Sequence, residues 1–350
     1  MPGSGGRSLA WSAVPRRLLV LAVVVAVAAG AAVERNTDDA VLSSAEPGGL
    51  SRAPARMGSP PIADAPVAEP SSAEPAPAPV TPPEPDAPSV PDVELTVAPV
   101  AADDPAGLAE QILVAERAIR ADDATPDSLA RFGHLQQVAY RALVVHPEWD
   151  AEVAAALPDD LRPVMAANVL AGRELRRPLR NPQTQLPAWR IVQPAPAEEL
   201  RAYYEEGEAT YGVPWEYLAA VNLTETRMGR IRGLSTAGAR GPMQFIPSTW
   251  AHYGQGDIDD PHDAILAAAR YLAANGGGSG NMANALYRYN PVSWYVKAVT
   301  AYAEQMVADE RAYLGYHAWQ VYFTTELGDV LLPVGYEATE RRPVTPADLS

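Results

Sequence analysis

The distribution of proline sets the first limit on how this chain can fold. The 350 residues include 35 prolines, and these crowd the stretch from about Asp38 to Pro105 together with Ala, Glu, Ser and Val. Proline lacks a backbone N–H and has a fixed φ, so runs such as 75–79 and 82–85 build neither a helix nor a strand ladder. We therefore expect residues 36–105 to be a disordered Pro/Ala-rich linker. Extended at about 3.1 Å per residue, it would reach on the order of 180 Å. Its composition fits both a spacer whose length matters for reaching a distant substrate and an inert linker of no particular length.

The N-terminus predicts export. Arg7, Arg16 and Arg17 precede an apolar run, 18–33, which ends in small residues. Residues 1–35 therefore fit an export signal that leaves the rest of the chain outside the cytoplasm. The run is slightly short for a membrane span of about 20 residues, and a cleaved signal peptide and an uncleaved N-terminal membrane anchor both fit. We expect an exported protein of the cell envelope or the extracellular space, which touches the cytoplasmic membrane only through this segment.

Charge and missing residue types exclude several classes of function. A formal net charge of −16 disfavours nucleic acid as a partner and leaves no polybasic patch for an anionic membrane. The chain has no cysteine, which excludes disulfides and thiolate metal sites. The five histidines show no metal-ligand spacing. Residues 257–268 fail as a calcium loop, because His262 stands where glycine is needed and Ala268 where glutamate is needed. We expect no metal and no cofactor, and nothing in the sequence indicates an oligomeric state.

Residues 106–180 have the pattern of a helical region. Apolar residues recur at i, i+4, i+7 and i+11, on one helical face: Leu108, Ile112, Ala115 and Ile119. The triplet 125–127, Thr-Pro-Asp, is typical of a helix start. Further short helices are expected between Pro147, Pro158 and Pro163. No residue here suggests chemistry, so we expect a packing role.

The C-terminal residues 316–350 predict a small β-hairpin extension and a tail. Segments 319–323 and 329–334 alternate or are apolar around Gly328. With the helical patterns before it, this gives a mainly α fold class.

Glu225 is the strongest candidate for a catalytic residue. It shares one helical face with Leu218, Val221 and Met228. A carboxyl on an apolar face has a raised pKa, as an acid that protonates a glycosidic oxygen requires. The pattern alone favours the other reading, a glutamate at a helix end that bonds a neighbour such as Arg227 or Arg230.

The segment 235–247, Ser-Thr-Ala-Gly-Ala-Arg-Gly-Pro-Met-Gln-Phe-Ile-Pro, predicts a tight irregular loop. Its glycines let a ligand approach the backbone closely. Gln244 offers both a donor and an acceptor, as an N-acetyl sugar requires.

Together these segments resemble a known family. Leu-Thr-Glu-Thr-Arg at 223–227, the loop motif Ser-x-x-Gly-Ala-x-Gly-x-Met-Gln-x-x-Pro at 235–247 and Tyr-Asn at 289–290 resemble the lytic murein transglycosylases of the goose-type-lysozyme-like fold. Segments 225–230, 260–264 and 289–295 are similar to the membrane-bound lytic transglycosylase B group. The chain departs from the family where Glu-Thr replaces a common Glu-Ser, and where Pro291 replaces the alanine of Tyr-Asn-Ala-Gly.

The resemblance covers roughly residues 197–314, and we expect a lysozyme-like transglycosylase domain at 195–315. It implies a catalytic Glu225 and peptidoglycan glycan strands as partner. Expected substrate-binding residues are Gln244, Met243, Tyr289, Asn290 and Ser235. Tyr289 and Asn290 should lie at a helix end on the cleft rim, whereas Met243 fits both a cleft floor and simple packing. Tyr295, on the last long helix, fits core and ligand contact equally.

The resemblance implies cleavage with a single carboxylate. Glu225 would first protonate the oxygen between N-acetylmuramic acid and N-acetylglucosamine, and would then deprotonate the muramic C6 hydroxyl to close a 1,6-anhydro ring. A muramidase of the lysozyme type stays an alternative and needs a second carboxylate, for which Asp257, Asp259 and Asp260 are candidates. A non-catalytic cell-wall-binding protein is the other alternative.

Overall fold

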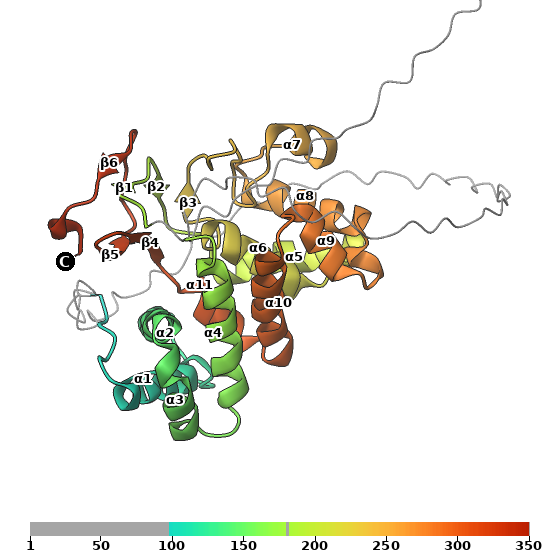
Figure 1. Cartoon of the computed structure of the whole chain (residues 1–350). Helices are drawn as coiled ribbons and strands as arrows, with labels where there is room; N and C mark the ends of the chain where they lie inside the picture. Colours follow the sequence, from blue (N-terminus) through green and yellow to red (C-terminus); the bar gives the residue numbers. More distant parts are fainter. Residues whose placement is uncertain (1–97, 180–181, 350) are drawn as a thin grey trace, which may run out of the picture. The chain divides into compact units, whose positions relative to one another are not determined.

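The computed structural model describes residues 98–179 and 182–349 (Figure 1). The expected export segment, 1–35, and most of the expected linker, 36–105, lie outside the described residues. Over the described ranges, no helix has the length and apolar character needed to cross a membrane.

The structure is mainly helical. The helices are α1 (Pro105–Ile119), α2 (Pro126–Val145), α3 (Asp150–Ala156), α4 (Arg162–Arg176), α5 (Ala197–Tyr211), α6 (Trp215–Thr226), α7 (Pro247–Tyr253), α8 (Pro261–Ala274), α9 (Met282–Tyr289), α10 (Ser293–Ala308) and α11 (Arg311–His317), with short 3-10 turns η1 (Pro147–Trp149), η2 (Gly277–Ser279) and η3 (Pro346–Leu349). The strands are β1 (Gln185–Leu186), β2 (Arg190–Ile191), β3 (Ile231–Arg232), β4 (Val321–Thr325), β5 (Gly328–Leu332) and β6 (Arg342–Pro343). They form three antiparallel pairs, β1 with β6, β2 with β3 and β4 with β5.

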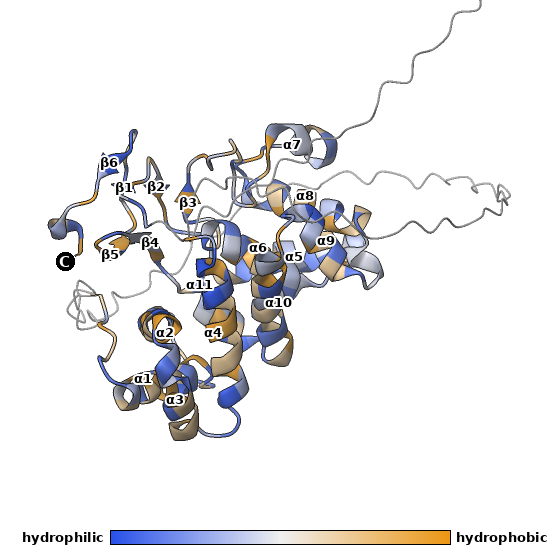
Figure 2. Ribbon diagram, viewed as in Figure 1, coloured by the Kyte–Doolittle hydropathy of each residue, from blue (hydrophilic) through white to orange (hydrophobic). Residues whose placement is uncertain are grey.

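The N-terminal helices form as the sequence indicates. The apolar face predicted for α1 is fully buried, and α1 packs on α2. Thr125 caps α2 in a reciprocal capping box with Ser128, which satisfies two backbone donors at the helix start. Pro163 was expected to separate helices, but it lies in the first turn of α4, where its missing N–H costs nothing. Figure 2 shows that α2 and α4 each carry both hydrophobic and hydrophilic residues.

The N-terminal helices share the main core with the later ones. Ala171 and Leu175 of α4 belong to the same cluster of buried residues as the helices from α5 onward, and α4 packs closely on α10. A smaller cluster holds α1, α2 and α4 together around residues such as Leu108 and Leu143. Residues 106–180 thus pack against the rest of the fold, as expected for a region with a structural role.

Helix α6 lies in the interior. Every residue from Leu218 to Thr226 is buried, and α6 contacts α5, α8, α10 and α11. A helix that is buried on all sides belongs to the centre of a core rather than to its surface. The expected apolar face extended to Met228, but the helix ends at Thr226. Met228 lies beyond the end in the left-handed region, with φ of 59°.

The C-terminal hairpin is confirmed. Strands β4 and β5 pair from Val321 opposite Leu332 to Thr325 opposite Gly328. Asp329 on β5 forms ion pairs with Arg141 of α2 at 2.5 Å and with Arg176 of α4 at 2.7 Å. The hairpin is therefore bound electrostatically to the N-terminal helices.

We expect Asp329→Asn to lower the free energy of unfolding at pH 7 by about 2 kcal/mol. Burial alone would raise the pKa of Asp329, but Arg141 and Arg176 together lower it to about 2. A depressed pKa stabilises the fold only while the carboxyl is ionised. The difference from wild type is therefore complete above about pH 4 and is lost as the pH falls toward 2. Urea unfolding at several pH values measures it, with the exposed Asp123→Asn as control. A difference that does not change with pH would contradict this assignment.

Candidate active site

Glu225 lies in the last turn of α6 and is only 1% exposed. The Tyr295 hydroxyl of α10 donates a hydrogen bond of 2.8 Å to its Oε1, while Oε2 has no partner among the described residues. Burial raises the pKa of Glu225 to about 8, although the bond from Tyr295 acts in the opposite direction. Near neutral pH the side chain is therefore a protonated acid with one oxygen unengaged.

The arginines that follow Glu225 do not neutralise it. Arg227 donates from Nη1 to the backbone oxygen of Leu223 at 3.0 Å. Arg230 donates from Nη2 to the backbone oxygen of His317 at 3.1 Å. The alternative in which Glu225 only bonds a neighbouring arginine at the helix end is therefore wrong.

The backbone after α6 is strained. Arg227 and Met228, with φ of 54° and 59°, and Gly229, with φ of 84°, are left-handed in succession. Gln244, with φ of 49°, is the one other non-glycine residue with positive φ in the described part of the chain. Such conformations cost about 1–3 kcal/mol each and cluster at functional sites. Here they flank Glu225 and the loop beside it.

Two polar side chains of α6 bind this loop. Thr226 donates from Oγ1 to the Pro242 backbone oxygen at 2.6 Å and accepts from the Gly229 N–H at 3.0 Å. Asn222, one turn earlier, also donates to the Pro242 oxygen, at 2.9 Å. The hydroxyl that this chain keeps in its Glu-Thr sequence therefore fixes the loop against the helix that carries Glu225.

The loop 235–247 is as tight as the sequence predicts. Ser235 accepts hydrogen bonds at its Oγ from the N–H groups of Ala237 and Ala239, at 3.2 and 3.0 Å, so its hydroxyl shapes the loop. Gly241 has φ of 78°, and a Cβ there would lie 1.9 Å from the Ile258 backbone oxygen, so only glycine fits.

Met243 and Gln244 are both buried in this loop. Met243 is fully enclosed in the main core, so of the two alternatives for it the structure favours packing. Gln244 donates from Nε2 to the Gly241 backbone oxygen at 3.2 Å, while its Oε1 has no partner in the described residues. Its acceptor is therefore still unengaged, as recognition of an amide N–H would require.

Tyr289 and Asn290 end α9 beside this loop. The Tyr289 hydroxyl donates to the Met243 backbone oxygen at 2.5 Å, and its ring lies parallel to that of Tyr295 at 6.5 Å between centroids. Asn290 was expected on the cleft rim, but it is only 1% exposed. Neither its Oδ1 nor its Nδ2 has a partner among the residues that the structure describes.

Several of the unsatisfied buried polar atoms belong to these elements. Glu225, Gln244 and Asn290 each contribute such atoms, and Tyr289 and Tyr295 connect the elements that carry them. Buried polar atoms are normally paired, and an orphan costs about 1–3 kcal/mol. A cluster of them is typical of a binding site.

Sequence reasoning missed several residues of the site. Asn222 had no role assigned, although a polar residue in an apolar helix was the available signal. Around Tyr289, ring contacts of 5.4 to 5.9 Å run from Trp250 through Phe245 to Tyr289 and Tyr271. Nothing in the spacing of these aromatics indicated that they meet.

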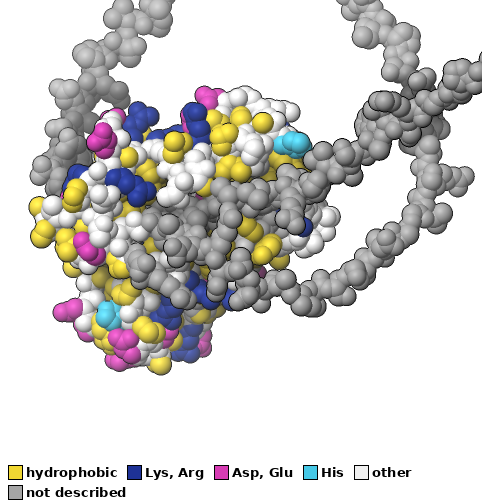
Figure 3. Space-filling view, turned by 45° about the horizontal axis from the view of Figure 1, so that its top comes forward, with side chains coloured by type: hydrophobic (Ala, Val, Ile, Leu, Met, Phe, Trp, Pro, Cys, Tyr) yellow, Lys and Arg dark blue, Asp and Glu magenta, His cyan; other side chains and the backbone are white. Residues whose placement is uncertain are grey.

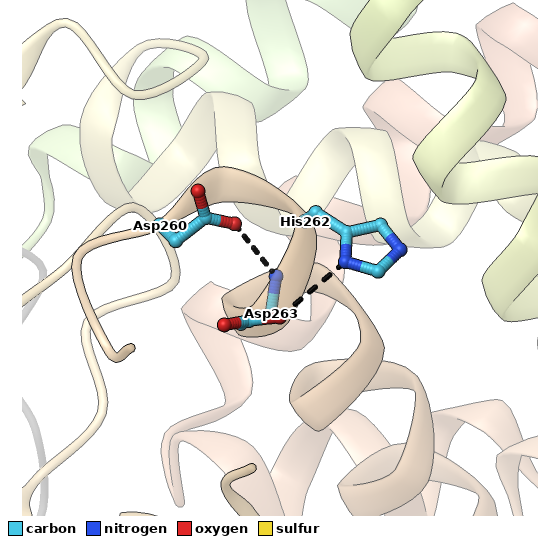
Figure 4. A group of neighbouring side chains, drawn as sticks. All are labelled: Asp260, His262 and Asp263. Carbon is cyan, nitrogen blue, oxygen red and sulfur yellow. Dashed lines mark hydrogen bonds and ion pairs between the residues drawn. The ribbon is translucent and has the colours of Figure 1, made fainter. Parts of the chain in front are cut away.

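Asp260, His262 and Asp263 come together at the start of α8 (Figure 4), with atoms close enough to hold an ion. Asp260 caps the helix by accepting from the Asp263 N–H at 3.1 Å. Asp263 accepts from the Asp257 N–H at 2.8 Å, and His262 pairs with Glu206 at 3.0 Å. Each side chain already has a structural partner, so we assign the cluster to helix capping.

The sequence profile of the transglycosylase SLT domain matches residues 202–308. Residues 202–308 are a transglycosylase SLT domain. The match includes Glu225, the loop 235–247 and both Tyr289 and Asn290. The lytic transglycosylase family expected from the motifs is thereby confirmed, together with a mainly α, lysozyme-like fold.

One curated relative is the membrane-bound lytic murein transglycosylase F of Thiobacillus denitrificans (strain ATCC 25259 / T1), which is 33% identical over 75 residues. The alignment spans 21% of this chain and 16% of that protein. The relative is named transglycosylase F, whereas the short motifs resembled the B group. No solved structure matches the chain.

We expect Glu225→Gln to make the protein more stable at neutral pH. The unfolded chain ionises this carboxyl above about pH 4.5, whereas the folded protein keeps it protonated up to about pH 8. A pKa raised by folding therefore lowers stability progressively across this window. At pH 7 the variant should gain on the order of 3 kcal/mol in free energy of unfolding. The two proteins should converge as the pH falls to about 4.5.

Urea unfolding at pH 4.5, 6 and 7 tests this prediction, with the exposed Glu110→Gln on α1 as the matched control. Equal free energies of unfolding for wild type and Glu225→Gln at pH 7 would show that folding does not raise the pKa of this carboxyl, and would contradict the prediction.

Proposed function

We propose that this chain is a peptidoglycan lytic transglycosylase, a carbon–oxygen lyase. It cleaves the β-1,4 bond between N-acetylmuramic acid and N-acetylglucosamine and leaves 1,6-anhydro-N-acetylmuramic ends. The observation that carries this proposal is Glu225, a buried carboxyl with a pKa raised to about 8 and one unengaged oxygen, inside a transglycosylase SLT domain.

In the first step, protonated Glu225 gives its proton to the glycosidic oxygen as the bond from that oxygen to the muramic C1 breaks. Positive charge develops on C1 and its ring oxygen. The acetamido group of the same sugar stabilises this charge. Tyr295, by donating to Oε1, favours the carboxylate that Glu225 becomes.

In the second step, the Glu225 carboxylate removes the proton of the muramic C6 hydroxyl, and the C6 oxygen bonds to C1. The glutamate ends protonated, as it began. No water is consumed, so one carboxyl serves as acid and then as base, and the chemistry calls for no metal or cofactor.

The amides around Glu225 suit the N-acetyl groups of the substrate. Gln244 offers an unengaged acceptor, and Asn290 offers both a donor and an acceptor. Tyr289 holds the loop through the Met243 backbone. We assign Gln244, Tyr289 and Asn290 to orienting the sugars, and Met243 and Ser235 to supporting the loop.

A lysozyme-type muramidase is the second candidate, and the acids that it would need are engaged elsewhere. Asp257 accepts from the Asp259 N–H, Asp259 forms an ion pair with Arg240, and Asp260 caps α8. Burial and the Tyr295 bond are the two influences on the Glu225 pKa. A second carboxylate within about 6 Å would add to them. Both observations favour the route with one carboxylate over hydrolysis.

The proposed substrate also supports the expected location. Peptidoglycan lies outside the cytoplasmic membrane, so an enzyme that acts on it works in the cell envelope. This agrees with the export signal expected from the N-terminal sequence.

Purified peptidoglycan treated with the full chain should release muropeptides that are lighter by one water than hydrolytic products. Glu225→Gln should abolish their release while the protein stays folded. Mass spectrometry of the products measures both. Hydrated reducing ends would identify a muramidase instead, and release of anhydro products by Glu225→Gln would contradict the assignment of Glu225.

The alkaline limb of the pH profile should report the Glu225 pKa. Activity needs the protonated acid, so kcat/KM should fall as the pH rises through about 8. Tyr295→Phe removes the hydrogen bond that favours the carboxylate, so its limb should move to higher pH. Tyr302→Phe, a buried tyrosine on the same helix, is the control and should leave the limb in place. A limb that moves to lower pH in Tyr295→Phe would overturn this account.

A further inference from the structure

A groove of about 500 Å³ lies beside the candidate active site, and we call it the arginine groove. Its charged lining residues are Arg190 of β2, Arg232 of β3, Arg240 of the loop and Asp259. Lys and Arg side chains (dark blue) are prominent toward the top of the face in Figure 3. The chain as a whole carries a net charge of −16, so a groove rich in arginine is unusual on it.

Two of these arginines face each other across a strand pair. Arg190 and Arg232 are direct partners in the antiparallel register of β2 and β3, an arrangement that is destabilising for like charges. The Arg190 side chain forms no hydrogen bond or ion pair with any described residue. Glu337 lies in register on its other side, but no ion pair joins them. The charge of Arg190 is therefore available to a ligand.

The acidic residues nearby offset the charges of Arg240 and Arg232, but they form no ion pair with Arg190. The Asp259 carboxylate pairs with Arg240, while its backbone oxygen accepts from Arg232 Nη1 at 2.7 Å. Asp257 and Asp260 accept hydrogen bonds from backbone N–H groups of their own loop and of α8. Arg232 thus donates to a backbone oxygen and is also attracted by these aspartates, whereas Arg190 has no ion pair among the described residues.

The groove continues into the active-site loop. Gly241 lines the groove, and its backbone oxygen accepts from both the backbone N–H and the Nε2 of Gln244, at 3.0 and 3.2 Å. Gly241 thus connects the lining of the groove to the residue that carries the unengaged amide oxygen.

We propose that the arginine groove binds the free carboxylates of the peptide stem attached to the muramic sugar at the cleavage site. This inference rests on the proposed function. The glycan itself is uncharged once its lactyl carboxyl is joined to the stem, so the stem supplies the anions. Guanidinium groups bind carboxylates in a two-pronged geometry, and the volume is in the range of sites for small ligands. Arg190 and Arg232 contact the stem and set the preference for strands that carry it.

Binding is measured in the Glu225→Gln variant, which leaves the strand uncut, at 0.15 M salt. The probes are purified glycan oligosaccharides with intact stems and the same oligosaccharides with stem carboxylates converted to methylamides. The Glu225→Gln variant, the parent for the further substitutions, should bind the intact strands about fivefold more tightly than the amidated strands. A factor of this size corresponds to the free energy of one exposed charge pair. Adding Arg190→Gln should bring this ratio close to one. Arg190→Lys should retain part of it, and Arg131→Gln on α2 should leave it unchanged.

The groove assignment is overturned if the parent binds both strands equally, if Arg190→Gln keeps the parent's ratio, or if it weakens both strands alike. It is also overturned if a phosphodiester polymer competes for Arg190 while amidation of the stems has no effect, because the groove would then belong to a phosphate-bearing wall polymer. A parent that binds neither strand, together with a wild type that releases no anhydro product, would instead reject the proposed function. Unfolding midpoints confirm that each variant is folded.

Discussion

The burial of one carboxyl group at the end of α6 is the constraint on which the rest of the structure depends. An ionised carboxylate in this place would be costly, and Tyr295 is the one side chain that bonds Glu225 in the described residues. The protein therefore keeps Glu225 protonated, which requires that the end of α6 be buried. The packing of α5, α8, α10 and α11 around that helix achieves this. Stability is given up at Glu225 so that an acid is ready near neutral pH.

The position of the loop 235–247 follows from the same helix. Asn222 and Thr226 both bond the Pro242 backbone oxygen, so α6 presents Glu225 and holds the loop that carries Gln244. The Tyr204 hydroxyl donates to Asn222 at 2.7 Å, which extends the network to α5. The proposed acid and the amide proposed to orient the sugar are thus fixed to one helix, and a shift of that helix would move both together.

The sequence was most informative where local chemistry decides the structure. The helix start at Thr125, the hairpin around Gly328 and the burial of Glu225 were all predicted from local patterns. It was less informative where distant segments meet. Met228 was expected on the helix, because periodicity does not show where a left-handed backbone ends a helical turn. Asn290 was expected at the surface but is buried. Its burial could not be predicted, because it depends on how α9 packs against the loop. Arg190 and Arg232 come together only through the pairing of β2 with β3. Strands of two residues are too short to show a sequence pattern, so this pairing could not be predicted.

The contacts of the C-terminal segment determine when the fold can be completed. Trp319 donates from Nε1 to Gln136 at 2.8 Å, and its ring faces the Arg227 guanidinium at 5.6 Å. Asp329 pairs with Arg141 and Arg176. Until the last few dozen residues have been synthesised, these polar groups of α2, α4 and the turn after α6 lack their partners. The order of synthesis therefore places the completion of these contacts at the end, after every helix that packs around Glu225 has been made.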